Sequence, residues 1–134
     1  MSQQIVVPLG GSPTARFVTV AGTVDAEGID TSHNTTLQRF TLEFNLSDLH
    51  PTALPPPLSG YSLRASAQAG LTSINNSDDA PEWTWAVDGA RTIIREGKLV
   101  LVVDLAGQGG PDSEIVYHDA VLSSLTYQVS VLVS

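Results

Sequence analysis

Alternation of apolar and polar residues predicts β-strands along most of this chain. In LQRFTLEFNL, Phe40, Leu42 and Phe44 fall on one face of an extended strand, and the polar residues between them fall on the other. The same two-residue period recurs in GYSLRASAQA, EWTWAV and LTYQVSVLVS. No stretch keeps a helical period beyond two turns, and only His118–Leu125 has a pattern that allows a single helical turn. We therefore expect an all-β protein.

Turn signals divide the chain into about eight or nine short expected strands. The other expected strands are Ile5–Val7, Arg16–Val24, Arg91–Arg95, Lys98–Leu105 and Glu114–Tyr117. Between strands lie segments such as LGGSP, DAEGID, NNSDDAP and GQGGPDS, which are typical of turns. This spacing predicts an antiparallel β-sandwich, of jelly-roll or Greek-key type, in a single domain spanning residues 1–134.

Two of the connections allow more specific predictions. REGK, residues 95–98, reads as a tight hairpin in which Gly97 takes a positive φ. HPTALPPPLSG, residues 50–60, reads as a long loop that crosses from one sheet to the other.

Two strands are apolar beyond what one buried face requires. In KLVLVVDL, Val100 and Val102 make the second face apolar too, so this strand is either covered on both faces or lies at an interface. The tail from Leu125 contains no Lys or Pro to protect an edge, so it either lies inside a sheet or pairs with another subunit. The residues that we expect at a subunit interface are Ile5, Val6, Val7, Val100, Val102, Leu125, Tyr127, Val129, Val131 and Val133.

Composition narrows the classes of partner and cofactor. The net charge is −8, and the chain has no Cys. Its five arginines are scattered along the sequence, and Lys98 is its single lysine. Phosphate-binding surfaces need clustered Lys or Arg, so we expect neither nucleic acid nor an anionic membrane as a partner. The first residues, MSQQIVVPLGG, lack the pattern of a signal peptide, and no apolar run is long enough to span a bilayer. We expect no cofactor.

Two residue patterns have the elements of a hydrolytic site. His118-Asp119 with Ser123 and Ser124 supplies the residue types of a nucleophilic triad, but adjacent strand residues point to opposite faces. Ile29-Asp30-Thr31-Ser32 resembles the apolar-Asp-Thr-Gly turn of aspartic proteases, although Ser32 replaces Gly and Gly28 interrupts the strand that normally leads in. A turn stabilised by the Asp side chain explains the same residues, so we expect no enzyme.

Acidic and aromatic residues offer two possible ligand sites. Asp25, Glu27 and Asp30 form one acidic cluster and Asp78-Asp79 another, but their spacing matches no Ca²⁺ loop, so we expect no metal site. Trp83 and Trp85 share one face of a strand and could stack as a sugar platform, or fill the core.

The function expected after these exclusions is structural. We expect a homo-oligomer, with a trimer as one option, that acts through protein–protein contacts in a larger shell. The concrete version is a small virion component, such as a capsid decoration protein of a tailed bacteriophage, assembled in the host cytoplasm. The alternatives are a carbohydrate-binding module that uses Trp83 and Trp85, with or without Ca²⁺, and a small hydrolase that uses Asp30.

Overall fold

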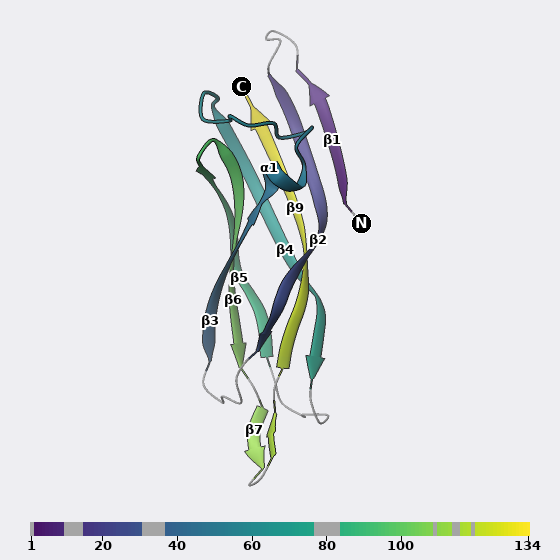
Figure 1. Cartoon of the computed structure of the whole chain (residues 1–134), viewed down its shortest axis with the longest axis vertical. Helices are drawn as coiled ribbons and strands as arrows, with labels where there is room; N and C mark the ends of the chain where they lie inside the picture. Colours follow the sequence, from purple (N-terminus) through teal and green to yellow (C-terminus); the bar gives the residue numbers. More distant parts are fainter. Residues whose placement is uncertain are drawn as a thin grey trace.

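Nearly all of the described chain is antiparallel β-structure. The computed structural model describes residues 2–9, 15–30, 37–76, 84–108, 110–113, 116–118 and 120–134. Figure 1 shows an elongated molecule in which long strands run along the main axis. The strands are β1 (Gln3–Pro8), β2 (Arg16–Asp30), β3 (Gln38–Asn45), β4 (Leu63–Asn76), β5 (Thr84–Arg95), β6 (Lys98–Gln108), β7 (Gly110–Ser113), β8 (Val116–His118) and β9 (Ala120–Val133). The all-β prediction is confirmed.

The strands form two main antiparallel sheets and one small hairpin. The four-stranded sheet has the order β1-β2-β9-β4, the three-stranded sheet has the order β3-β6-β5, and β7 pairs with β8. The C-terminal strand β9 is central: Val131 lies opposite Val18 of β2 on one side and opposite Ala65 of β4 on the other. Of the two positions expected for the tail, the structure therefore shows the one inside a sheet.

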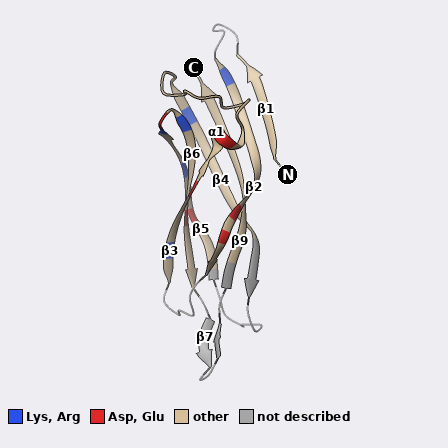
Figure 2. Cartoon of the chain, viewed as in Figure 1, with Lys and Arg blue, Asp and Glu red and all other residues tan. Residues whose placement is uncertain are grey.

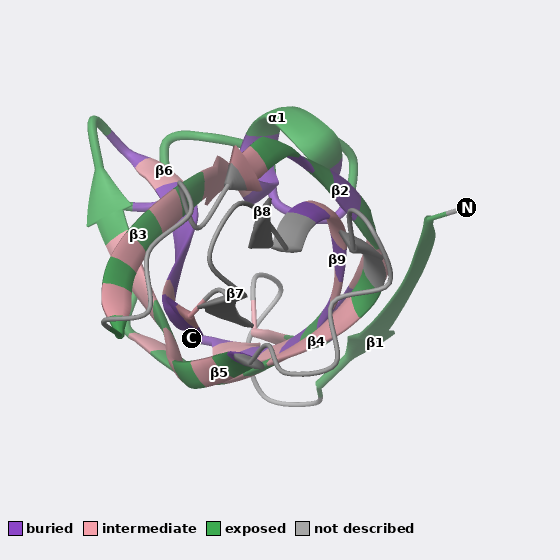
Figure 3. Ribbon diagram, turned by 90° about the horizontal axis from the view of Figure 1, so that it is seen from below, coloured by how far each residue is buried: buried purple, intermediate pink, exposed green. Residues whose placement is uncertain are grey.

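A shared apolar core lies between the two main sheets. Its members come from both sheets because alternate residues of each strand point to the same side. Figure 3 shows the buried residues lining the inside of the ring of strands. The fully buried strand residues include Val18, Val20, Leu99, Leu101, Val103, Leu122, Val129, Val131 and Val133.

The strands are longer than the sequence pattern predicts. β2 runs for 15 residues and continues through DAEGID, which we expected to be a turn. The register shifts between Asp25 and Ile29, where Glu27 has φ 58° and Gly28 has φ 64°. Such a bulge breaks the two-residue period without ending the strand, so the strand reads as two pieces in the sequence. The described residues of His118–Leu125, the segment whose pattern allows a single helical turn, lie instead in β8 and β9.

The only helix in the described part of the chain is the short α1 (Leu46–Leu49), which follows β3. Asn45 caps it by accepting a hydrogen bond from the Asp48 N–H at 3.0 Å. The chain after α1 crosses from β3 in one sheet to β4 in the other, as predicted for the proline-rich loop. This crossing buries Leu54 and Leu58 in the core.

The REGK connection forms the expected tight hairpin between β5 and β6. Arg95 lies opposite Lys98, and Glu96 and Gly97 have φ values of 53° and 76°. The Gly97 carbonyl accepts a hydrogen bond from the Leu58 N–H at 2.7 Å, so the hairpin also holds the crossing loop.

Candidate functional site

The first strand is the most distinctive surface feature of the molecule. β1 lies at the end of the four-stranded sheet and has β2 as its only hydrogen-bonded neighbour among the described strands. All six of its residues are exposed, including Ile5 (62 %), Val6 (43 %) and Val7 (46 %). Figure 3 shows β1 standing outside the ring of strands. Apolar side chains are thus in water on both faces of one edge strand.

The apolar surface extends from β1 onto its neighbours. Phe17 lies opposite Val7 on β2 and is 41 % exposed. Leu132 of β9 lies opposite Phe17 and is partly buried. Residues that face each other across antiparallel strands share one side of the sheet, so these side chains adjoin. We call Ile5, Val7, Phe17 and Leu132 the edge patch. Sequence reasoning missed Phe17 and Leu132, because their neighbours depend on the strand order.

β1 itself carries no charge, and the nearest charged residue on its partner strand is Arg16, which lies opposite Pro8. No residue from Ser2 to Leu9 is charged. Figure 2 shows β1 without acidic or basic residues along its whole length, whereas β2 carries acidic residues farther along. Approach of another apolar surface to β1 therefore requires no desolvation of a charge from β1 itself.

The expected interface residues of the tail lie elsewhere. Leu125, Tyr127, Val129, Val131 and Val133 are all at most 5 % exposed and belong to the core between the two sheets. Their side chains are therefore unavailable at the surface of the folded chain, and the expectation that they form a subunit interface is corrected. The physical reason is that β9 has a partner strand on each side and a second sheet against its apolar face.

Val100 and Val102 are also buried, on the opposite face of β6 from the core. They are 5 % and 2 % exposed, although neither belongs to the core cluster between the sheets. Val102 lies between Glu43 of β3 and Arg91 of β5. Ion pairs join Arg95 to Glu43 and Arg91 to Asp104 across this face. These two valines are thus covered within the chain and are not an exposed interface.

The ionised state is favoured for the acidic members of these pairs. The hydrogen bond from Arg95 holds the pKa of the Glu43 carboxyl below its ordinary value. The hydrogen bond from the Thr41 hydroxyl, followed by that from Arg91, lowers the pKa of Asp104. All four groups are exposed in part, so the pairs order the face more than they stabilise the fold.

A buried polar pair lies under the helix. His50, which follows α1, shares a hydrogen bond of 2.6 Å between its Nε2 and the hydroxyl of Tyr127 on β9. Both residues are at most 5 % exposed. Burial lowers the pKa of His50 and raises that of Tyr127, so both are neutral near pH 7. The sequence gives no signal that joins residues so far apart.

Trp85 is part of the core and not a surface platform. It is 7 % exposed, and its ring packs against Phe40 with centroids 5.4 Å apart. The other flank of the ring lies against Gly107, where an added Cβ would approach within 2.7 Å. Trp83 lies outside the described residues. Of the two roles considered for this pair, Trp85 therefore has the one in the core, and the alternative of a surface platform is not available to it.

The candidate acidic sites do not form a metal site in the described part of the chain. Among the described residues, no three His, Asp or Glu side chains come together in a group that could hold a metal ion. The Asp25 carboxylate accepts a hydrogen bond from the Glu27 N–H at 2.6 Å, so it stabilises the bulge of β2. Asp78 and Asp79 lie outside the described residues.

The residues of the two hydrolytic patterns lie mainly in strands. The backbone of Asp30 is paired with Val121 at the end of β2, so Asp30 is in a strand and not in the expected turn. Thr31, Ser32 and Asp119 lie outside the described residues. The Ser124 hydroxyl is hydrogen-bonded to the Thr72 hydroxyl at 3.0 Å.

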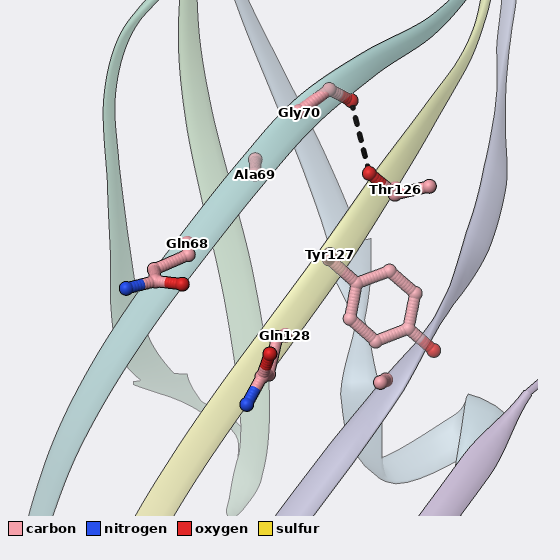
Figure 4. A pocket seen from close by; sticks show the side chains of 7 residues that line it. Gln68, Ala69, Gly70, Thr126, Tyr127 and Gln128 are labelled. Carbon is pink, nitrogen blue, oxygen red and sulfur yellow. Dashed lines mark hydrogen bonds between the residues drawn. The ribbon is translucent and has the colours of Figure 1, made fainter.

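The outer face of the four-stranded sheet carries a shallow hollow lined by uncharged residues. This hollow, of about 340 Å³, lies over β4 and β9 and is shown in Figure 4. The amides of Gln68 and Gln128 project from neighbouring strands, and the Thr126 hydroxyl donates to the Gly70 carbonyl at 3.4 Å. Such a surface can offer hydrogen bonds, but these side chains include no acid, base or strong nucleophile.

The described residues contain no helix with the length and apolar character needed to cross a membrane. Comparisons of the chain with protein-family models, with curated proteins and with solved structures each found no match.

Proposed function

We propose that this protein is a non-enzymatic structural subunit that acts through protein–protein contacts in a larger assembly. The observation that carries this proposal is the edge strand β1, which is uncharged, apolar and exposed on both faces. Proteins normally protect such edges with charged residues, prolines or covering segments, because an open edge pairs with other chains. β1 has Pro8 at its last position, but it has no charged residue, and no element of the described chain covers it. Such a lightly protected edge is typical of a site that another polypeptide occupies.

The arrangement of strands supports a more specific proposal. We infer a β-sandwich of jelly-roll or Greek-key type, because β2, β3, β4 and β5 alternate between the two sheets and β9 returns between β2 and β4. Jelly rolls are common in viral capsid domains and also in lectins. By this analogy of fold class, we propose a small virion component, such as a capsid decoration protein of a tailed bacteriophage, assembled in the host cytoplasm.

The alternative of a carbohydrate-binding module has less support. Its expected platform needs the faces of both Trp83 and Trp85, and Trp85 is in the core. A lectin-like role would have to use other residues.

Sedimentation of the native protein tests the proposed function. A lysate of the producing cells is separated on a sucrose gradient, and an antibody against this chain locates it. We expect the chain in the fractions that contain particles of capsid size. Recovery only in the slow fractions, apart from every particle, would contradict the assembly role.

A further inference from the structure

β1 differs from the other strands that end a main sheet. β3, at the edge of the three-stranded sheet, carries Arg39 and Glu43. β4, at the other edge of the four-stranded sheet, lies beside β5. Apart from Pro8 at its end, β1 has no protecting residue, and no described element covers it, so it is the most open edge in the described part of the chain.

The hydrogen bonds of the hairpin fix which groups of β1 face outward. The Leu9 N–H donates to the Ala15 carbonyl at 2.9 Å. Main-chain groups alternate in direction along an antiparallel strand, so the N–H and C=O groups of Ile5 and Val7 also point toward β2. Gln4, Val6 and Pro8 then direct their main-chain groups to the open edge.

The hydrogen bonds of β9 lead independently to the same assignment of which main-chain groups face β1. Ser134, at the end of β9, exchanges both main-chain hydrogen bonds with Ser62. The main-chain N–H and C=O groups of Val133 and Val131 therefore point toward β2, where these residues lie opposite Arg16 and Val18. That leaves Phe17 and Thr19 to bond with β1, opposite Val7 and Ile5.

We propose that β1 pairs with β1 of a second copy of this chain, antiparallel and about a two-fold axis at Ile5. This inference rests on the proposed structural role and specifies the contact that serves it. Ile5 lies opposite Ile5 of the second copy, and Gln4 lies opposite Val6 of the second copy. The two sheets become one continuous sheet, and the edge patches adjoin across the axis.

Pro8 disfavours the register that has Val6 on the axis. With Ile5 on the axis, Gln4 and Val6 of the second copy exchange both main-chain bonds, and the Pro8 carbonyl accepts from the Ser2 N–H, so only the Ser2 carbonyl at the end of the strand lacks a donor. With Val6 on the axis, Pro8 lies opposite Gln4, and a carbonyl inside the paired segment lacks a donor because proline has no N–H. The register at Ile5 therefore leaves its unsatisfied carbonyl at the strand end, where water reaches it.

A second copy is favoured over a charged partner because the edge segment is uncharged. Each chain carries a net charge of −8, but Ser2–Leu9 contributes none of it. Two copies can therefore join at β1 with their acidic residues away from the axis, and added salt should strengthen the contact by screening the remaining repulsion.

Single cysteines test the register directly, since the natural chain has none. In the proposed pairing the two Ile5 residues form a non-hydrogen-bonded pair with Cα atoms about 4.5 Å apart, which suits a disulfide. Ile5→Cys should therefore form a covalent dimer within minutes of adding copper-phenanthroline, as seen on a non-reducing gel. Gln3→Cys is the control, because its two thiols would be about 13 Å apart along the strands. A covalent dimer of Val6→Cys without one of Ile5→Cys would overturn the proposed register.

A matched pair of prolines tests the open edge. Val6→Pro removes an N–H that faces outward, so it should weaken dimerisation at least about tenfold and leave the thermal midpoint unchanged at concentrations where the wild type is monomeric. Val7→Pro removes an N–H that bonds to β2, so it should lower protection of β1 from amide exchange. Analytical ultracentrifugation gives the dimer dissociation constant in each case. Equal dimerisation of the wild type and Val6→Pro would overturn pairing at this edge.

Failure of this pairing is distinguishable from failure of the assembly role. If the wild-type chain sediments with capsid-sized particles but Ile5→Cys forms no covalent dimer, the assembly role stands and β1 pairing is wrong. If Ile5→Cys forms a dimer but the native chain avoids every particle, the β1 pairing stands and the virion role is wrong.

Discussion

The Nε2 atom of His50 lies 2.6 Å from the hydroxyl oxygen of Tyr127, in the core between α1 and β9. This pair joins the crossing loop to the central strand of the larger sheet. Each residue satisfies a polar atom of the other that would otherwise be buried without a partner.

Removal of the tyrosine hydroxyl should therefore be costly. Tyr127→Phe leaves the His50 ring nitrogen buried without its partner, and we expect the free energy of unfolding to fall by about 1–3 kcal/mol. Urea denaturation followed by circular dichroism measures this change. Gln128→Ala, on the exposed face of the same strand, is the control and should change stability by less than about 0.5 kcal/mol. Equal stability of Tyr127→Phe and the wild type would show that the hydrogen bond is not important for the fold.

The same pair should make stability depend on pH. Burial lowers the folded-state pKa of His50 below its ordinary value of 6.5, so the unfolded chain takes up the proton first. The contribution of neutral His50 to the free energy of unfolding is fully present above about pH 6.5. It is lost as the pH falls toward the folded-state pKa. We expect the urea midpoint to fall between pH 7 and pH 5.5 in the wild type, and to fall less in His50→Gln. Parallel pH profiles for the two proteins would contradict this prediction.

Close packing of Trp85 against Gly107 should exclude a larger residue. Gly107→Ala places a Cβ within 2.7 Å of the indole ring, so the ring or the strand must move. We expect a loss of about 1–3 kcal/mol, measured by urea denaturation. Gly60→Ala is the matched control, because its added Cβ meets nothing within 4 Å, and it should leave the midpoint unchanged. Similar effects of the two substitutions would mean that the Trp85 site has room to adjust.

The covered valines of β6 should contribute more than the ion pairs above them. Val102 is 2 % exposed, so Val102→Ala should cost about 1–3 kcal/mol through lost burial and a small cavity. Arg91→Gln breaks the pair with Asp104 at an exposed position and should have the smaller effect. Thermal unfolding of both variants, at low and at high salt, compares the two contributions. A larger loss for Arg91→Gln would mean that the charges hold this face together.

The sequence alone determined the class of structure, because strand formation depends on local alternation. The faces of β3, the turn at Gly97 and the crossing of the proline-rich loop all follow from residues near one another in the chain. The bulge at Glu27 and Gly28 was not readable, since a positive φ at a non-glycine residue leaves no periodic signal.

Which apolar strands are covered and which are open depends on how the two sheets are assembled. The tail and β1 look alike as strings of apolar residues, yet Val131 is fully buried and Ile5 is 62 % exposed. The difference comes from strand order: β9 has β2 and β4 as neighbours, whereas β1 has β2 alone. Strand order depends on contacts between distant residues, which a local pattern does not record. For the same reason the pairing of His50 with Tyr127 and the burial of Trp85 appear only when the two sheets meet.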